Sequence, residues 1–165
     1  MELEELRRAL VQLLPRLRRF ARSLARSVHD ADDLVQTAIE RALLRAHQLR
    51  ADAPLASWMF GIVRNAWIDE ARSRSRRARL LAPAELAEEV ADAAASPAGA
   101  LEIEDALERL SEEQRLAVSL VLIEGLSYKE AAEIMEVPIG TLTSRLARGR
   151  EALQRLLGES TGALT

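Results

Sequence analysis

The chain has 165 residues, of which 48% are hydrophobic and 3% aromatic, and it contains no cysteine. Leucine and alanine dominate, which favours packed helices over sheet. Without cysteine there is no thiolate metal site and no sign of an oxidising compartment. No apolar stretch is long enough to span a bilayer, and the acidic N-terminus is unlike a signal peptide, so we expect a soluble cytoplasmic protein.

The net charge of −3 is unevenly distributed. Residues 1–79 carry 16 arginines and 10 acidic side chains, a net charge of +6. Residues 80–110 carry one basic and eight acidic side chains, a net charge of −7, and residues 111–165 have a net charge of −2. The basic first segment favours a nucleic-acid partner, and the acidic second segment is typical of a self-repelling connector.

Two helices are expected first. One covers residues 3–27, with a kink or restart at Pro15, because proline removes a backbone donor. Asp30 is the predicted N-cap of the next helix, with Asp33 in a capping-box-like position, and that helix should end near Gln48.

A third predicted helix, over residues 55–79, changes character along its length. Its first half is apolar on nearly every side, as in buried helices. Trp58 and Trp67 there are better explained as core residues than as platforms for unpaired bases. The second half carries five arginines, which either contact phosphates or form a solvated helix end that suits the helix dipole: Arg72, Arg74, Arg76, Arg77 and Arg79.

A linker and a second domain follow. Residues 80–100 are rich in alanine, acidic residues, proline and glycine, and we interpret them as a flexible linker that can extend about 65–70 Å. Residues 101–158 form the second domain, and residues 159–165 are a tail that frays. Two capping boxes and a glycine stop divide this domain into helices: Ser111 with Gln114, Ser127 with Glu130, and Gly125.

Residues 126–150 have the layout of a helix-turn-helix, whose second helix enters a DNA major groove. An inward apolar face is predicted for Ile139, Leu142, Leu146, Leu153 and Leu157. The outward face carries side chains that bond bases or phosphates: Thr141, Thr143, Ser144, Arg145 and Arg148. The alternative without DNA binding is an ordinary amphipathic helix with a solvated polar face. The capped helix and the Pro138 turn that precede this helix disfavour that alternative.

Nothing indicates catalysis. His29 lies near three aspartates, but capping explains two of these carboxylates, and no second histidine or cysteine lies near. There is no phosphate-cradling glycine loop and no nucleophile motif. We expect neither an enzyme nor a metal or cofactor.

The sequence resembles a two-domain extracytoplasmic-function (ECF) sigma factor, most closely the general-stress branch in its N-terminal half. The resemblance rests on residues 30–46, 56–72, 110–115 and 137–146. It implies an all-α fold of two small helical domains and a transcription initiation factor that binds core RNA polymerase and promoter DNA. An anti-sigma factor is a further implied partner, whereas membrane insertion and a small-molecule substrate are not implied.

The resemblance also implies roles for individual residues. Residues 1–79 correspond to region 2, which binds core polymerase and opens the −10 element, and residues 101–158 to region 4, which reads the −35 element. Implied polymerase contacts are Asp33, Leu34, Gln36, Thr37, Glu40 and Arg41. Implied −10 contacts are Asn65, Arg72, Arg74, Arg76 and Arg77, with the 48–54 loop near the capture pocket. Implied −35 contacts are the outward residues of the helix-turn-helix.

Two departures and two rival functions accompany this interpretation. Glu136 replaces a glycine usual in the turn, where positive φ is often needed, and Thr143 replaces a common lysine. One alternative function is that of a sigma-like decoy, which binds an anti-sigma factor but no DNA. The other is a stand-alone helix-turn-helix repressor. The DNA-facing arginines disfavour the decoy. In the repressor the N-terminal half would be a sensor or a dimerisation domain, and polymerase would not be needed for function.

Overall fold

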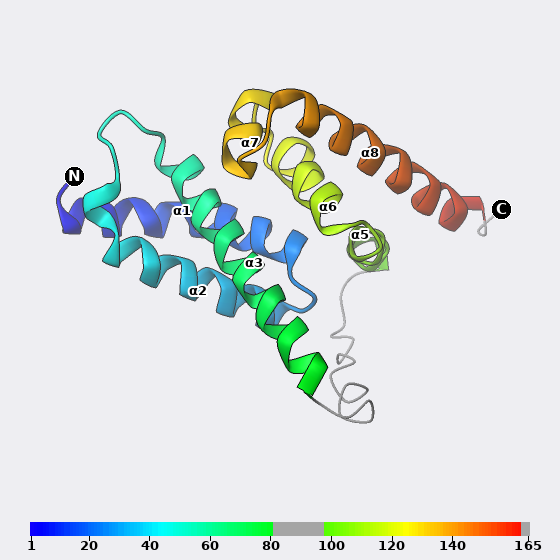
Figure 1. The fold of residues 1–165 in the computed structure, drawn as a ribbon, viewed down its shortest axis with the longest axis horizontal. Helices are drawn as coiled ribbons and strands as arrows, with labels where there is room; N and C mark the ends of the chain where they lie inside the picture. Colours follow the sequence, from blue (N-terminus) through cyan, green and yellow to red (C-terminus); the bar gives the residue numbers. More distant parts are fainter. Residues whose placement is uncertain (81–97, 163–165) are drawn as a thin grey trace.

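A computed structural model describes residues 1–80 and 98–162, with side chains described over 1–80 and 102–158. All regular elements in these ranges are helical, so the predicted all-α fold is confirmed. Figure 1 shows them in chain order: α1 (Leu3–Leu24), α2 (Val28–Leu44), the 3₁₀ turn η1 (Ala46–Gln48), α3 (Leu55–Leu80), α5 (Ala98–Glu108), α6 (Glu112–Val118), the π-helical turn η3 (Ser119–Ile123), α7 (Tyr128–Met135) and α8 (Ile139–Gly162).

Helices α1, α2 and α3 pack against one another as an N-terminal bundle. Its centre is aromatic: the Phe20 and Phe60 rings meet edge to face, with centroids 4.9 Å apart, and both are fully buried. Such a pair contributes about 0.5–1.5 kcal/mol beyond the area it buries. Trp67 is buried and Trp58 half-buried, which agrees with the prediction that both belong to the core.

Two predicted boundaries in this bundle are wrong. Helix α1 runs through the exposed Pro15 as one continuous helix, so the predicted restart does not occur, although proline removes one backbone hydrogen bond there. Helix α2 begins before Asp30: the Asp30 backbone N–H donates to the Ser27 Oγ at 3.0 Å, so Ser27 is the N-cap. Serine is as good a cap as aspartate, and the cap at Ser27 leaves Asp30 free for another contact.

Helices α5 to α8 form the C-terminal bundle, in which α8 packs against α6, α5 and α7. The Gln114 N–H donates to the Ser111 Oγ at 3.2 Å, which confirms the first predicted cap. Leu142 and Leu146 are buried as predicted, but Ile139 is 50% exposed. Gly149, further along α8, is also buried. A Cβ at this position would lie 2.8 Å from the Val118 Cγ2, so glycine allows α8 to approach α6 closely.

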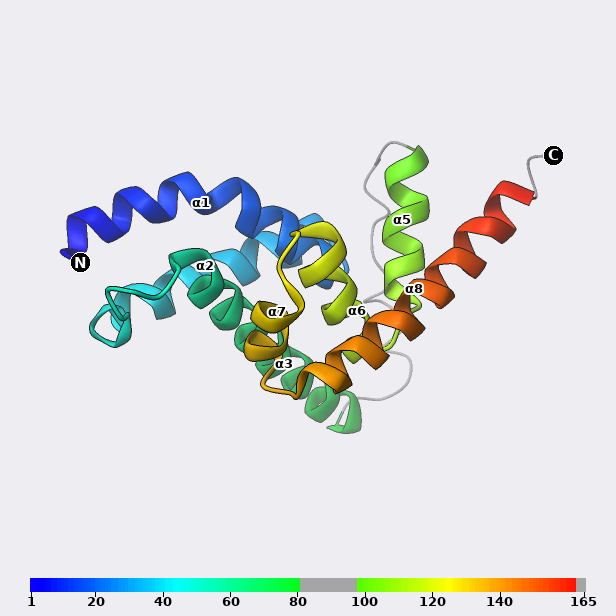
Figure 2. The same ribbon diagram turned by 90° about the horizontal axis from the view of Figure 1, so that it is seen from above.

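The two bundles pack against each other. Helix α7 lies on α3 (Figure 2). Helix α1 contacts η3, α5 and α6. The buried apolar side chains of both bundles form one continuous cluster. The predicted linker, residues 80–100, lies largely outside the described residues, and α5 begins at Ala98. The contact between the bundles is not predictable from the sequence pattern.

Candidate nucleic-acid interface

The helix-turn-helix is built from α7, a tight turn and α8. The Glu130 N–H donates to the Ser127 Oγ at 3.1 Å, so the second predicted cap is confirmed. The turn passes through Glu136, whose φ of 57° and ψ of 44° are left-handed. The expectation of positive φ at this residue is therefore confirmed. The Leu142 N–H then donates to the Pro138 carbonyl at 3.1 Å, which starts α8.

The outward face of α8 presents most of the predicted −35 residues to solvent. Thr143, Ser144 and Arg148 are exposed, whereas Thr141 and Arg145 are half-buried. The Thr143 hydroxyl donates to the Ile139 carbonyl at 2.8 Å, and the Ser144 hydroxyl donates to the Gly140 carbonyl at 3.1 Å. Each hydroxyl keeps acceptor capacity for a base amino group.

Arg145 is less exposed than Arg148 and has a carboxylate partner. Its guanidinium lies 3.4 Å from the Glu113 carboxylate, and its side chain is 26% exposed. It also lines a cleft of about 420 Å³ between the two bundles, together with Arg64, Trp67, Arg72, Glu112, Glu113 and Met135. An arginine paired in this way must exchange its carboxylate for a base or a phosphate before it can read DNA.

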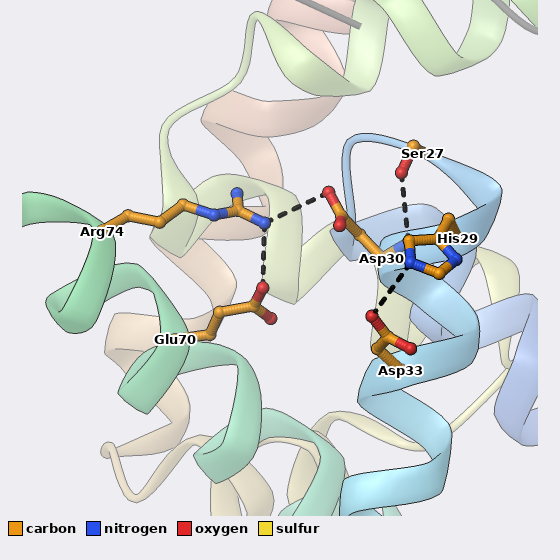
Figure 3. Close-up of polar contacts among 6 residues, drawn as sticks. All are labelled: Ser27, His29, Asp30, Asp33, Glu70 and Arg74. Atoms are coloured by element: carbon orange, nitrogen blue, oxygen red, sulfur yellow. Dashed lines mark hydrogen bonds and ion pairs between the residues drawn. The ribbon is translucent and has the colours of Figure 1, made fainter. Parts of the chain in front are cut away.

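The arginine-rich end of α3 divides into two kinds of side chain. Arg72, Arg76 and Arg77 are exposed and suit phosphate contacts. The Arg74 guanidinium instead donates to the Glu70 carboxylate at 2.9 Å and the Asp30 carboxylate at 3.2 Å (Figure 3). Arg74 therefore ties α3 to the first turn of α2.

Two further regions carry predicted contacts. Asn65 is exposed on α3, and its Oδ1 accepts from Arg64 at 3.0 Å. On α2, Arg41 pairs with Asp69 of α3 at 2.9 Å. Four of the predicted polymerase contacts are exposed or half-buried on α2: Asp33, Gln36, Thr37 and Glu40. Leu34 is only 3% exposed and belongs to the core, so it does not form part of this face.

The sequence interpretation missed a buried polar contact between the bundles. Glu124, just after η3, has a side chain with no exposed surface. Both of its carboxylate oxygens accept from Arg19 of α1 at 2.9 Å, and the Arg16 guanidinium lies 3.6 Å away. The hydrogen bond with Glu124 is the main cause that raises the pKa of Arg19 above its ordinary value. A glutamate at a helix end gives no signal of its partner when the partner lies 105 residues away.

The histidine and aspartates at the start of α2 do not form a cluster. The acidic side chains near His29 do not converge: His29 pairs with Asp33 at 3.5 Å, whereas Asp30 faces Arg74 (Figure 3). Within the described ranges no group of three or more His, Cys, Asp or Glu side chains could hold a metal ion. Nor is any helix in them long and apolar enough to cross a membrane.

A capped helix-turn-helix on one bundle and an arginine-lined helix end on the other define a DNA-binding protein of the transcription-factor class. Residues 10–77 match Sigma-70 region 2, and residues 100–153 match Sigma-70, region 4. The chain belongs to the ECF RNA polymerase sigma factors, and it is a promoter-directing transcription initiation factor.

The individual comparisons support this membership over most of the chain. The sequence is 42% identical over 142 residues to the ECF RNA polymerase sigma factor SigM of Mycobacterium tuberculosis, covering 86% of this chain and 71% of the relative. It is 36% identical over 167 residues to EcfG of Rhodopseudomonas palustris, covering 93% and 86%. The sigma factor RpoE of Bartonella quintana, solved in complex with the anti-sigma factor NepR, superimposes with a TM-score of 0.81 and 32% identity, covering 94% and 98%.

Proposed function

We propose that the chain directs polymerase with two separate DNA surfaces, one on residues 101–158 for the −35 element and one on residues 1–79 for the −10 element. The observation that carries this is the outward face of α8, where Thr143, Ser144 and Arg148 are exposed directly after a capped helix-turn-helix. Hydroxyls and arginines at that position contact base edges or phosphates in the major groove.

The −10 surface is proposed to lie on α3 and the loop before it. Exposed Arg72, Arg76 and Arg77 supply phosphate contacts, and exposed Asn65 supplies a polar group for an extruded base. The 48–54 loop, mostly exposed, is the neighbouring candidate for base capture. Extrusion of one base costs a few kcal/mol, so several such contacts are required together. Arg74 is assigned to the fold and not to this surface, because two carboxylates already bind it.

The polymerase surface is proposed to be the solvent-facing side of α2. It contains Asp33, Gln36, Thr37, Glu40 and Arg41, all exposed or half-buried. Such a rim of mixed charge is suited to a transient, polar interface.

We also propose that an anti-sigma factor holds this chain inactive in the cytoplasm. Its support is the similarity, over nearly the whole chain, to a sigma factor solved with its anti-sigma factor. Such a partner acts by competition, because it binds the same folded surfaces that polymerase or DNA would use.

The decisive experiment is run-off transcription with purified core polymerase across a genomic promoter pool. The parent chain should create start sites that core polymerase alone lacks, and Arg148→Ala should weaken those that depend on a −35 element. Arg155→Ala, an exposed arginine two turns further along α8, is the matched control. A chain that binds core polymerase without producing any new start site would contradict the proposal.

A further inference from the structure

The two bundles are joined by a buried carboxylate. The Glu124 side chain has no exposed surface, and it forms ion pairs with two arginines on α1 of the other bundle: Arg19 at 2.9 Å and Arg16 at 3.6 Å. Arg16 is itself held over the Phe60 ring, with its guanidinium carbon 5.2 Å from the ring centroid. A buried carboxylate is strongly destabilising when its cationic partner leaves, unless water reaches it.

A second acid–arginine pair lies at another point of the same interface. The Glu136 carboxylate, in the turn before α8, lies 3.6 Å from the Arg64 guanidinium of α3. Arg64 is 17% exposed at its side chain, and its Nε is buried with no hydrogen-bond partner among the described residues. Both pairs place an acid of the C-terminal bundle against an arginine of the N-terminal bundle.

This arrangement is incompatible with promoter binding as proposed above. Elements centred near −10 and −35 are about 25 base pairs apart, which is about 85 Å of duplex at 3.4 Å per base pair. Arg72, assigned to the first element, and Arg145, assigned to the second, line the same cleft of about 420 Å³. Both arginines cannot reach their elements until the bundles separate.

The two bundles are closed against each other in this structure, and we propose that Glu124, through its ion pairs with Arg16 and Arg19, is the latch that holds this closed form. The Glu136–Arg64 pair is a second, weaker contact of the same latch. The consequence for DNA binding rests on the proposed function, whereas the closure itself does not.

The latch sets an equilibrium between a closed and an open form. In the open form Glu124, Arg16 and Arg19 regain water, which offsets part of the lost attraction. The apolar contact between α3 and α7 also favours closure, so loss of the latch shifts the equilibrium without abolishing the closed form. Salt weakens the partly exposed pairs and should favour opening.

The test measures the distance between the bundles in the full-length free chain. The chain has no cysteine, so Ser73→Cys on α3 and Ala147→Cys on α8, both exposed, give unique sites for a donor and an acceptor dye. Single-molecule energy transfer then gives the fractions of closed and open molecules. Glu124→Gln and Arg19→Glu should each raise the ratio of open to closed molecules about tenfold at low salt.

Matched variants make the result interpretable. Glu4→Gln removes an exposed ion pair within α1 and should leave the distances unchanged. Far-UV circular dichroism checks that each variant folds, and Arg19→Glu, 55% exposed at its side chain, keeps the test available if Glu124→Gln does not fold. Parent-like distance distributions for the folded latch variants would overturn the proposal.

A second readout separates this inference from the proposed function. Unlabelled Glu124→Gln and Arg19→Glu should bind a −35 duplex about threefold or more tighter than the parent chain, because closure lowers the fraction of binding-competent molecules. Opening without any gain in duplex binding would support the latch and contradict the assignment of α8 to −35 DNA.

Discussion

Glu136 combines a left-handed backbone with an ion pair to Arg64 across the two bundles. Its φ is 57°, and it is the only non-glycine residue with positive φ in the described parts of the chain. A left-handed L-residue costs about 1–2 kcal/mol relative to a right-handed one. The carboxylate 3.6 Å from Arg64 gives this residue a role that glycine cannot supply.

The backbone cost and the ion pair can be separated with two substitutions. Glu136→Gly and Glu136→Gln both remove the charge, but only glycine relieves the left-handed strain. We expect Glu136→Gly to have a free energy of unfolding about 1 kcal/mol higher than Glu136→Gln. Urea unfolding followed by circular dichroism measures the difference. Equal stability of the two variants would mean that the turn rearranges and carries no strain.

The two arginines of α8 should differ in their response to substitution. Arg148→Ala should weaken binding to a −35 duplex by about 1–3 kcal/mol if the arginine contacts a guanine bidentately. Arg145→Ala should lose less net affinity, because this arginine must first leave Glu113. Glu113→Gln should accordingly tighten binding by up to about 0.5 kcal/mol, since the Glu113 carboxylate is largely exposed and the pair is weak.

Fluorescence anisotropy with a labelled duplex at fixed salt tests these values. Arg155→Ala, in an exposed position near the end of α8, is the control and should leave the affinity close to that of the parent. Equal losses for Arg148→Ala and Arg155→Ala would indicate nonspecific charge attraction and not a contact made by the recognition helix.

Local signals in the sequence were sufficient to predict most of the helices. The caps at Ser111 and Ser127 follow from the residues within one turn of each site, whereas the positive φ of Glu136 was expected only from the family resemblance, which places glycine there. The cap of α2 was misassigned because Ser27 and Asp30 are both good caps, and only the contact of Asp30 with Arg74 explains which one the chain uses. Periodicity could not reveal that partner, which lies 44 residues away.

In the candidate site, too, some features follow from the local sequence and others depend on distant residues. Exposure of Thr143, Ser144 and Arg148 follows from the helical period of α8. Burial of Leu34 also follows from the helical period of α2, although the family resemblance suggested a surface role. The Glu124 contacts depend on how two bundles meet, and no short-range pattern encodes that geometry.

The arginines at the end of α3 should separate into binding and structural residues. Arg76→Ala and Arg77→Ala should each reduce the slope of log K against log salt for promoter-complex formation by about 1, because each removes a phosphate contact. Arg74→Ala should leave that slope unchanged but lower the free energy of unfolding, because it leaves Asp30 and Glu70 without their cation. Salt titrations of the polymerase–promoter complex and urea unfolding measure the two effects.

A matched control for this set is Arg79→Ala, an exposed arginine of the same helix beyond the proposed contacts. If Arg74→Ala reduces the slope as much as Arg77→Ala does, Arg74 exchanges its carboxylates for phosphate and the structural assignment is wrong.

The close approach of α8 to α6 gives the last prediction. In Gly149→Ala the new Cβ would lie 2.8 Å from the Val118 Cγ2, 3.3 Å from the Gln114 carbonyl oxygen and 3.4 Å from the Gln114 Cβ. Because Val118 is buried and the carbonyl belongs to the backbone, neither can move freely, and we expect a loss of about 1–3 kcal/mol in the free energy of unfolding.

Gly158→Ala on the same helix is the control for this substitution, since a Cβ added at Gly158 would meet no other atom within 4 Å. Alanine there should be neutral or stabilise the protein by up to about 1 kcal/mol, because alanine favours the helix over glycine. Opposite signs for the two substitutions would establish that glycine at 149 serves packing and not helix flexibility. A stabilising Gly149→Ala would mean that α6 and α8 are further apart in solution than this contact requires.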